Sequence, residues 1–161
     1  MSKKVVQSVA ESIAADSSVL VGRCDHALDP KRRLTIPSVW RKAMGNPEYV
    51  YVMPDRKEKC LNLMPKAEMD VLLQKIREKA LFDPALNRLY QTIGSVSVQL
   101  DLDIQGRIRI SDRLLQFANL TTTVAMLGSF RMIKLWSPEA LPPENEIDTK
   151  ELDAALTAAG M

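Results

Sequence analysis

The stretch LDPKRRLTIP, residues 28–37, places three consecutive cations between an aspartate and a short alternating apolar run. A second stretch, LDIQGRIRIS, residues 102–111, repeats this pattern 74 positions later. Five of nine aligned positions match: Leu28 with Leu102, Asp29 with Asp103, Arg33 with Arg107, Leu34 with Ile108 and Ile36 with Ile110. Because similarity at a fixed spacing is typical of duplicated units, the sequence predicts two related halves.

The residues that follow each copy extend the similarity. A short stretch with helical character comes first, at residues 38–44 and 112–118, where we expect Trp40 and Leu114 to face inward. The predicted N-caps are Ser38 and either Ser111 or Asp112. Two apolar runs come next, YVYVM and CLNLM in the first copy and TVAML and MIKLW in the second. Each half therefore reads as strand, tight turn, strand, short helix, strand, strand.

The segment between the copies predicts a helical hairpin. Two apolar stripes have helical spacing, Met69, Leu72, Leu73 and Ile76 in the first and Leu86, Leu89, Tyr90 and Ile93 in the second. The Asp83-Pro84 step breaks the pattern between them. We expect a mainly β fold with helices, of the α+β class, in two pseudo-symmetric halves. The predicted boundaries are a flexible N-terminal extension (1–17), the halves (18–81 and 82–141) and an acidic tail (142–161) that can form a marginal helix.

The distribution of charge is uneven along the chain. From Ser137 to the end, six acidic side chains face one lysine, a net charge of −5, which leaves +7 on the rest of a chain whose formal net charge is +2. Cys24 and Cys60 are not closely spaced, so no disulfide framework or zinc site is indicated. The N-terminus carries acids and lacks a long apolar run, so we expect a cytoplasmic protein without a membrane span.

The first turn concentrates positive charge. Residues 23–42 carry a net charge of +4, whereas the equivalent residues 98–117 carry none. Clustered cations favour phosphate binding, and arginine in a two-stranded ribbon can also reach guanine in the major groove. Alternatively, Asp29 with Arg33 and Asp103 with Arg107 are ion pairs that only lock the turns, each worth roughly 0.2–1 kcal/mol. That alternative leaves Lys31, Arg32 and Arg109 unexplained.

The duplicated Asp-x-Lys-Gly-Arg-like turn, with an apolar-x-Ile-Pro strand end and a short helix after it, resembles the MraZ family of bacterial transcriptional regulators. The resemblance spans residues 19–141 and implies tandem AbrB/MazE-like domains, a double-split, swapped-hairpin β-barrel and ring-shaped homo-oligomers. It further implies double-stranded DNA as partner, through short direct repeats upstream of the division and cell-wall gene cluster, and a nucleoid-associated protein. The expected DNA-binding residues are Lys31, Arg32, Arg33, Arg107 and Arg109, and the expected turn-structuring residues are Asp29, Asp103 and Gly106.

Three residues depart from the family pattern. Arg32 stands where the family usually has glycine, and a left-handed conformation there would cost about 1–2 kcal/mol, although the side chain could add a phosphate contact. Gln105 and Ser111 replace residues that are often basic and proline. We therefore expect the second turn to contribute less to DNA binding than the first.

Two other classes of function compete with DNA binding. An enzyme needs converging titratable groups, and the candidates are Cys24 with His26, or Asp101 with Asp103 as a metal pair; structural roles explain both more simply. We expect no enzyme, metal, cofactor or small-molecule substrate. The other alternative is an antitoxin-like protein-interaction module, with the acidic tail as its binding extension. The same tail could instead shield the basic turns of its own chain.

Overall fold

The computed structural model describes residues 19–161, and the predicted N-terminal extension, residues 1–17, lies outside the described residues. The strands are β1 (Arg23–Ala27), β2 (Arg33–Thr35), β3 (Tyr49–Pro54), β4 (Leu61–Met64), β5 (Val98–Asp101), β6 (Arg107–Arg109), β7 (Thr123–Gly128) and β8 (Ile133–Trp136). The helices are α2 (Ser38–Ala43), α3 (Lys66–Ala80), η1 (Pro84–Leu86), α4 (Asn87–Val96), α5 (Asp112–Phe117), η2 (Pro138–Ala140) and α6 (Thr149–Ala158). The fold is therefore mixed α+β, as the sequence predicts.

The strands pair across the two copies of the repeat. The main sheet has the order β1-β7-β8-β4-β3-β5, and all its pairs are antiparallel. The first strand of each copy pairs with the third strand of the other, β1 with β7 and β5 with β3, while β4 and β8 meet at the centre. Strands β2 and β6 form a separate two-stranded ribbon, so the backbone pairing does not itself close a barrel.

The short helices bury their predicted inward faces. Trp40 in α2 is 5% exposed and Leu114 in α5 is 3% exposed, and both belong to the main hydrophobic core. The Trp40 indole N–H donates a 2.9 Å hydrogen bond to the carbonyl of Val21, which satisfies its only polar group. The predicted N-cap Ser38 is wrong, because Pro37 caps α2 and Ser38 is already helical. Ser111 does occupy the N-cap of α5, but its hydroxyl makes no capping bond.

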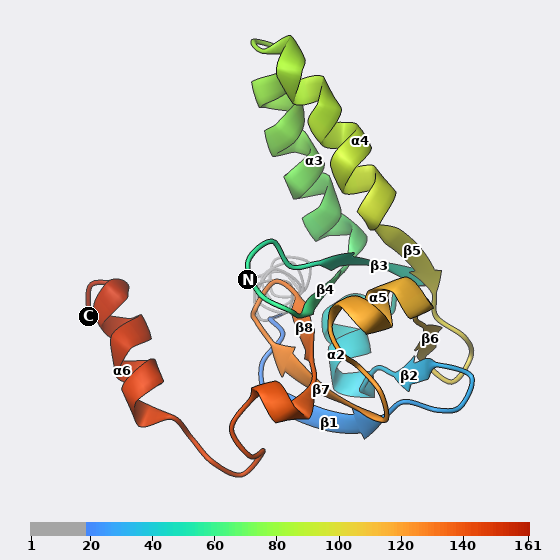
Figure 1. Cartoon of the computed structure of the whole chain (residues 1–161), viewed down its shortest axis with the longest axis vertical. Helices are drawn as coiled ribbons and strands as arrows, with labels where there is room; N and C mark the ends of the chain where they lie inside the picture. The colour runs from blue at the N-terminus through green and yellow to red at the C-terminus, as the bar shows by residue number, and fades with distance from the viewer. Residues whose placement is uncertain (1–18) are drawn as a thin grey trace, which may run out of the picture.

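The predicted hairpin of helices is confirmed. Helices α3 and α4 stand out together from one end of the sheet (Figure 1). At the break between them, the Asp83 side chain accepts a 2.9 Å bond from the backbone N–H of Ala85, which starts η1. Helix α3 buries Met69 and Ile76, whereas no residue of α4 is buried. The stripe predicted on α4 is therefore covered only in part: Leu86 and Ile93 are half-buried, and Leu89 and Tyr90 are each 37% exposed.

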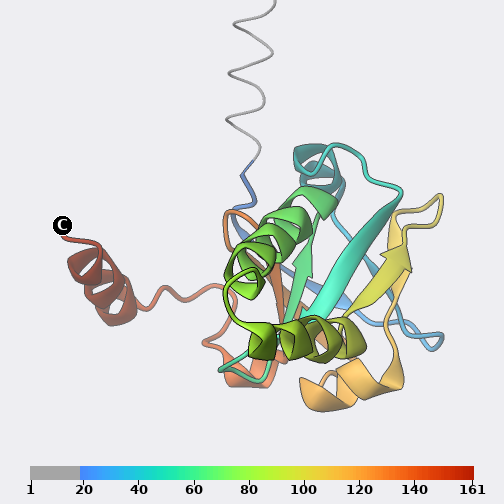
Figure 2. The ribbon, with the colours of Figure 1, turned by 90° about the horizontal axis from the view of Figure 1, so that it is seen from above.

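The acidic tail is tied to the sheet at its start, where Arg23 donates a 2.7 Å bond to the carbonyl of Pro142, and its helix α6 borders an open hollow beside Trp136. Asp148 caps α6 through a 2.9 Å bond from the N–H of Glu151, and no residue of this helix is buried. In two perpendicular views α6 lies on the side opposite to the turns that connect β1 to β2 and β5 to β6 (Figures 1 and 2). The tail thus does not cover the basic turns in this structure. Between residues 19 and 161, the helices are too short or too polar to cross a membrane.

Candidate nucleic-acid interface

The two turns share two side-chain hydrogen bonds, and in the second turn Asp103 also accepts a 2.9 Å bond from the backbone N–H of Gln105. In the first, Asp29 accepts bonds of 2.8 Å from the backbone N–H of Arg33 and 2.7 Å from its Nε. In the second, Asp103 accepts bonds of 3.0 and 2.7 Å from the same atoms of Arg107. Each aspartate therefore fixes both the backbone of its turn and the direction of one guanidinium group. The ion pairs foreseen as turn locks do form.

These hydrogen bonds also keep both aspartates ionised. The backbone N–H of Arg33, followed by its side chain, lowers the pKa of the Asp29 carboxyl. The backbone N–H of Arg107 does the same most strongly for Asp103, with help from its side chain and from the N–H of Gln105. Hydrogen bonds to a carboxylate favour its charged form. The two locks are therefore in place across the neutral pH range.

The backbone geometry of the turns is equally alike. Gly106 has a φ of 76° and Arg32, at the equivalent position, has a φ of 62°. Their N–H groups donate to the carbonyls of Asp103 and Asp29 at 2.9 and 2.8 Å. Arg32 thus adopts the left-handed conformation for which glycine is suited, at a cost of about 1–2 kcal/mol. The departure from the family pattern leaves the turn geometry unchanged.

The ribbon of β2 and β6 gathers three of the predicted arginines on one face. Leu34 pairs with Ile108, and both are completely buried. Because side chains alternate between the faces of a strand, the neighbouring positions point the other way. They are occupied by Arg33 opposite Arg109 and by Thr35 opposite Arg107. The three arginines come from turns 74 residues apart in sequence, yet they share one surface.

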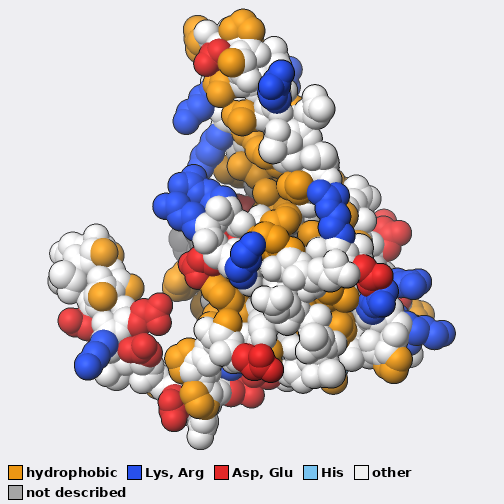
Figure 3. All heavy atoms as spheres, in the orientation of Figure 1, with side chains coloured by type: hydrophobic (Ala, Val, Ile, Leu, Met, Phe, Trp, Pro, Cys, Tyr) orange, Lys and Arg blue, Asp and Glu red, His pale blue; other side chains and the backbone are white. Residues whose placement is uncertain are grey.

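This arrangement does not serve the stability of the ribbon. Like charges directly opposite each other across a ladder are destabilising, and Arg33 faces Arg109. Among the residues that the structure describes, no ion pair involves Arg109, which is exposed. Both turns project on the same side of the molecule (Figures 1 and 2), where basic side chains are visible on the surface (Figure 3). Even with Asp29 and Asp103 counted against Arg33 and Arg107, Arg109 leaves this face positive, which suits it to bind an anion.

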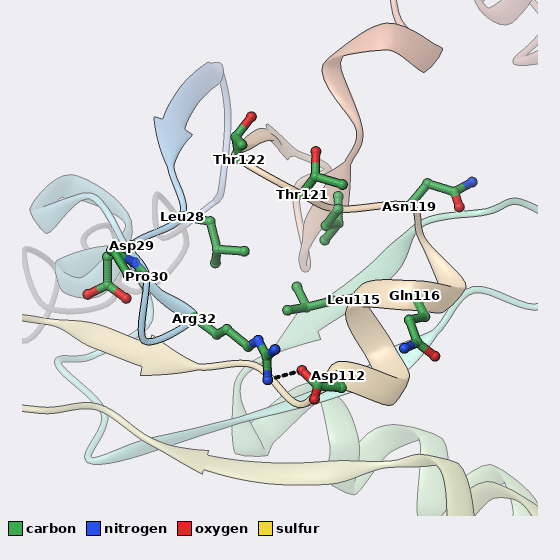
Figure 4. Close-up of a pocket in the computed structure, with 11 residues that line it drawn as sticks. Leu28, Asp29, Pro30, Arg32, Asp112, Leu115, Gln116, Asn119, Thr121 and Thr122 are labelled. Atoms are coloured by element: carbon green, nitrogen blue, oxygen red, sulfur yellow. Dashed lines mark ion pairs between the residues drawn. The ribbon is translucent and has the colours of Figure 1, made fainter.

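The two remaining predicted cations of the first turn behave differently. Lys31 is exposed at the tip, and no described residue forms an ion pair with it. Arg32 turns instead toward α5 and forms an ion pair with Asp112 across a hollow lined by Leu28 and Leu115 (Figure 4). Its side chain is 49% exposed. Arg32 is therefore partly neutralised within its own chain.

Arg41 lies within the basic stretch of residues 23–42, for which the sequence predicts no separate role at this position. Its Nε donates a 3.0 Å bond to the carbonyl of Ile36. A methyl group added to Gly106 would lie 2.5 Å from the same Nε, so the guanidinium of Arg41 rests directly on the second turn. Arg41 and Gly106 are far apart in sequence, so their contact is seen only because α2 packs closely on the second turn.

The surroundings of the side chains considered for catalysis fit structural roles. His26 is exposed, with its Nδ1 2.9 Å from the carbonyl oxygen of Ala27. Burial raises the pKa of the Cys24 thiol, so the thiolate that a nucleophile needs is disfavoured. Asp103 is engaged by Arg107, as described above.

Comparison with known proteins assigns the chain to a family. Residues 95–141 match the family described as "MraZ protein, putative antitoxin-like". A protein of Caulobacter vibrioides named "Transcriptional regulator MraZ" is 32% identical over 114 residues, which cover 70% of this chain and 73% of that protein. The chain belongs to the MraZ family. Relatives of the same name in Mannheimia succiniciproducens and Clostridium acetobutylicum are 31% and 27% identical, over 68% and 89% of this chain and 74% and 100% of theirs.

Proposed function

We propose that this MraZ family member is a transcriptional regulator that binds short direct repeats in a promoter. The observation that carries the proposal is the ribbon face on which Arg33, Arg107 and Arg109 meet. The names of its relatives support the class of function. As in the family resemblance, the target we propose is the promoter of the division and cell-wall gene cluster, which places the protein in the cytoplasm at the nucleoid.

The roles of the basic residues follow from their surroundings. Arg33 and Arg107 are held by their aspartates, so little side-chain freedom is lost when they bind, and their remaining N–H groups can contact base edges in the major groove. Arg109 and Lys31 are unpaired among the described residues and suit phosphate contacts, which add affinity without reading sequence. Arg32 contributes less, because its ion pair with Asp112 directs the guanidinium toward α5 (Figure 4).

A single ribbon binds weakly, so we propose that the chain acts as a homo-oligomer, in a ring. About three neutralised phosphates give a log–log salt slope of roughly −3. Several subunits on repeated sites raise the effective concentration of each further contact and can increase affinity by about 10²–10⁴-fold. The number of repeats and their spacing would then matter more than any one base.

The cross-pairing of β1 with β7 and β5 with β3 supports a swapped-hairpin architecture. We propose that the halves, residues 18–81 and 82–141, together form a double-split barrel around the core. In this arrangement neither half can fold without the other, because each supplies an edge strand to its neighbour. The chain needs neither catalysis nor a cofactor for this function.

An antitoxin-like protein-interaction module is the second candidate. Helix α6 favours it, because this acidic helix carries Leu152 and Leu156 without burying either. In that case the tail would bind a partner protein, and any binding to DNA would not depend on the number of repeats.

The decisive experiment is a mobility-shift titration on the DNA upstream of the chain's own gene. Repeats are removed one at a time, while a fragment of equal length with scrambled repeats serves as control. We expect affinity to fall steeply with each repeat lost and to fall again with added salt. Equal binding to every fragment would refute repeat recognition.

A further inference from the structure

Helix α6 has an apolar stripe that its own chain covers only in part, because Leu152 borders an open hollow shared with Leu127 and Trp136 of the sheet. Leu152 and Leu156 lie one helical turn apart, on one face, and are 51% and 43% exposed. Glu151 and Asp153 flank Leu152 on either side of this stripe. An isolated helix of ten residues is marginal in water. A partner surface that covers the leucines would stabilise it.

The molecule offers a matching groove where α3 packs on β3 and β4. Its lining is mostly apolar and consists of Met53, Pro54, Met64, Val71, Leu72 and Met132, with Arg56, Asn62, Glu68 and Lys75 among them. The cavity of about 240 Å³ has room for small apolar side chains such as leucine. Methionine side chains adapt their shape to an incoming group. The buried Oδ1 of Asn62 has no hydrogen-bond partner among the described residues.

The charges around the groove and on α6 are complementary. Arg56 and Lys75 stand at the groove, and Lys57 is exposed beside it on the same loop. Basic side chains gather along this flank below the helical hairpin, whereas acidic side chains dominate α6 (Figure 3). The stretch from Glu146 to Asp153 carries four acids against Lys150. Attraction of this kind orients two surfaces as they approach.

We propose that α6 of one copy docks in the methionine-lined groove of a second copy. Leu152 and Leu156 enter the groove, and Glu151 and Asp153 lie near Arg56 and Lys75. The connection from Leu141 to Ile147 contains two prolines and carries α6 away from its own sheet (Figure 2), which presents the helix to a neighbour. The inference rests on the proposed homo-oligomer and supplies a contact that builds it.

The first test measures mass by light scattering after size-exclusion chromatography. Leu156→Glu places a charge in the stripe, and we expect it to shift the oligomer toward the 18.0 kDa chain. Ala154→Glu adds the same charge on the opposite face of α6 and is expected to leave the mass unchanged. On the other side of the contact, Val71→Glu alters an exposed groove residue and should act like Leu156→Glu. An unchanged mass for both would overturn the proposal.

Charge reversal tests the pairing itself. Lys75→Glu alone should weaken the oligomer, and Glu151→Lys in the same chain should restore it. If Val71→Glu dissociates the oligomer while Leu156→Glu does not, another segment fills the groove and the proposal is wrong. If Leu156→Glu lowers stability without a change in mass, α6 docks on its own chain, which also overturns it.

Binding to a single DNA repeat separates this proposal from the proposed function. The variants of α6 should keep the single-repeat affinity of the unchanged protein and lose the gain from additional repeats. A protein that fails to bind any repeat, with its oligomer intact, would refute the DNA-binding function and leave the docking of α6 standing.

Discussion

The two turns have the same backbone conformation, but the arginine that lies at each turn comes from a different part of the chain. In the first turn, Arg32 occupies the left-handed position and pairs with Asp112 of α5. In the second, Gly106 occupies that position and Arg41 reaches in from α2. Each turn therefore packs on the short helix that belongs to the other copy. The comparison shows that duplicated units can keep a conformation while they redistribute the charges around it.

The tips of the turns differ as well. Lys31 stands at the first tip, whereas the second exposes Ile104 completely, followed by Gln105. A basic tip attracts phosphate, whereas an apolar tip has no charge with which to attract it. The difference between the tips is the reason to predict that the first turn contributes more to DNA binding, and the predictions below test how far the two turns differ.

The largest effect is expected from Arg33→Ala. Asp29 holds this guanidinium in position, and one bidentate base contact is worth about 1–3 kcal/mol. Because every subunit loses the contact, binding to several repeats should become undetectable in a mobility shift. Arg109→Ala removes a side chain without an ion pair among the described residues and should weaken binding only several-fold. Equal effects of the two variants would contradict the asymmetry.

Asp29→Asn tests whether Arg33 serves only as a turn lock. The variant breaks the ion pair but keeps the cation, and the neutral amide can still accept a backbone bond. If Arg33 contacts DNA, Asp29→Asn should retain far more binding than Arg33→Ala, while both lose some stability in urea. Equal loss of binding would indicate that the pair acts on the turn alone.

The second prediction concerns the stability of the turns. Gly106→Ala forces a side chain into a left-handed position, at about 1–2 kcal/mol, and pushes against Arg41. We expect a loss of at least this size in the free energy of unfolding, measured with urea. Arg32→Gly relieves the same strain and loses an exposed ion pair worth about 0–1 kcal/mol. It should leave stability unchanged or slightly higher, and a clear loss would show that the Arg32 contact matters more than its strain.

Much of this fold could be predicted because its signals are local. Turn residues, alternation and proline breaks lie within a few positions of the structure that they specify, so the helical hairpin and the inward face of Trp40 are correct. The N-cap at Ser38 failed, since Pro37 already has the extended backbone that a cap needs.

The surroundings of the candidate site could not be predicted in the same way. The pairing of Arg33 with Arg109, and of Arg32 with Asp112, joins residues that are far apart in sequence. These contacts exist because β1 and β5 cross to the opposite copy. Neither spacing nor composition records that exchange, so Arg41 received no role and Asp112 was considered only as an N-cap.

The third prediction is that Asp112→Asn tightens DNA binding. The change releases Arg32 from its only ion pair among the described residues, and one further phosphate contact would steepen the log–log salt slope by about 0.9. We expect a several-fold gain at low salt that shrinks at high salt. The gain should vanish in an Arg32→Gly background. A gain that persists there would mean that Asp112 acts only by repelling DNA.

The smallest expected effect is a shared loss of stability in acid. Backbone and side-chain hydrogen bonds from Arg33 and Arg107 lower the pKa of Asp29 and Asp103 below the ordinary aspartate value. A carboxyl with a lowered pKa in the folded state stabilises the fold above its unfolded pKa of about 3.9, and that contribution disappears as the pH falls through the lowered value. Urea midpoints measured from pH 5 downward should therefore decline. Asp29→Asn and Asp103→Asn should each flatten the decline by a similar amount, because both carboxylates accept bonds from the backbone N–H and the Nε of an arginine four residues on. A flattening by only one of them would show that the turns are less alike in solution than their backbones suggest.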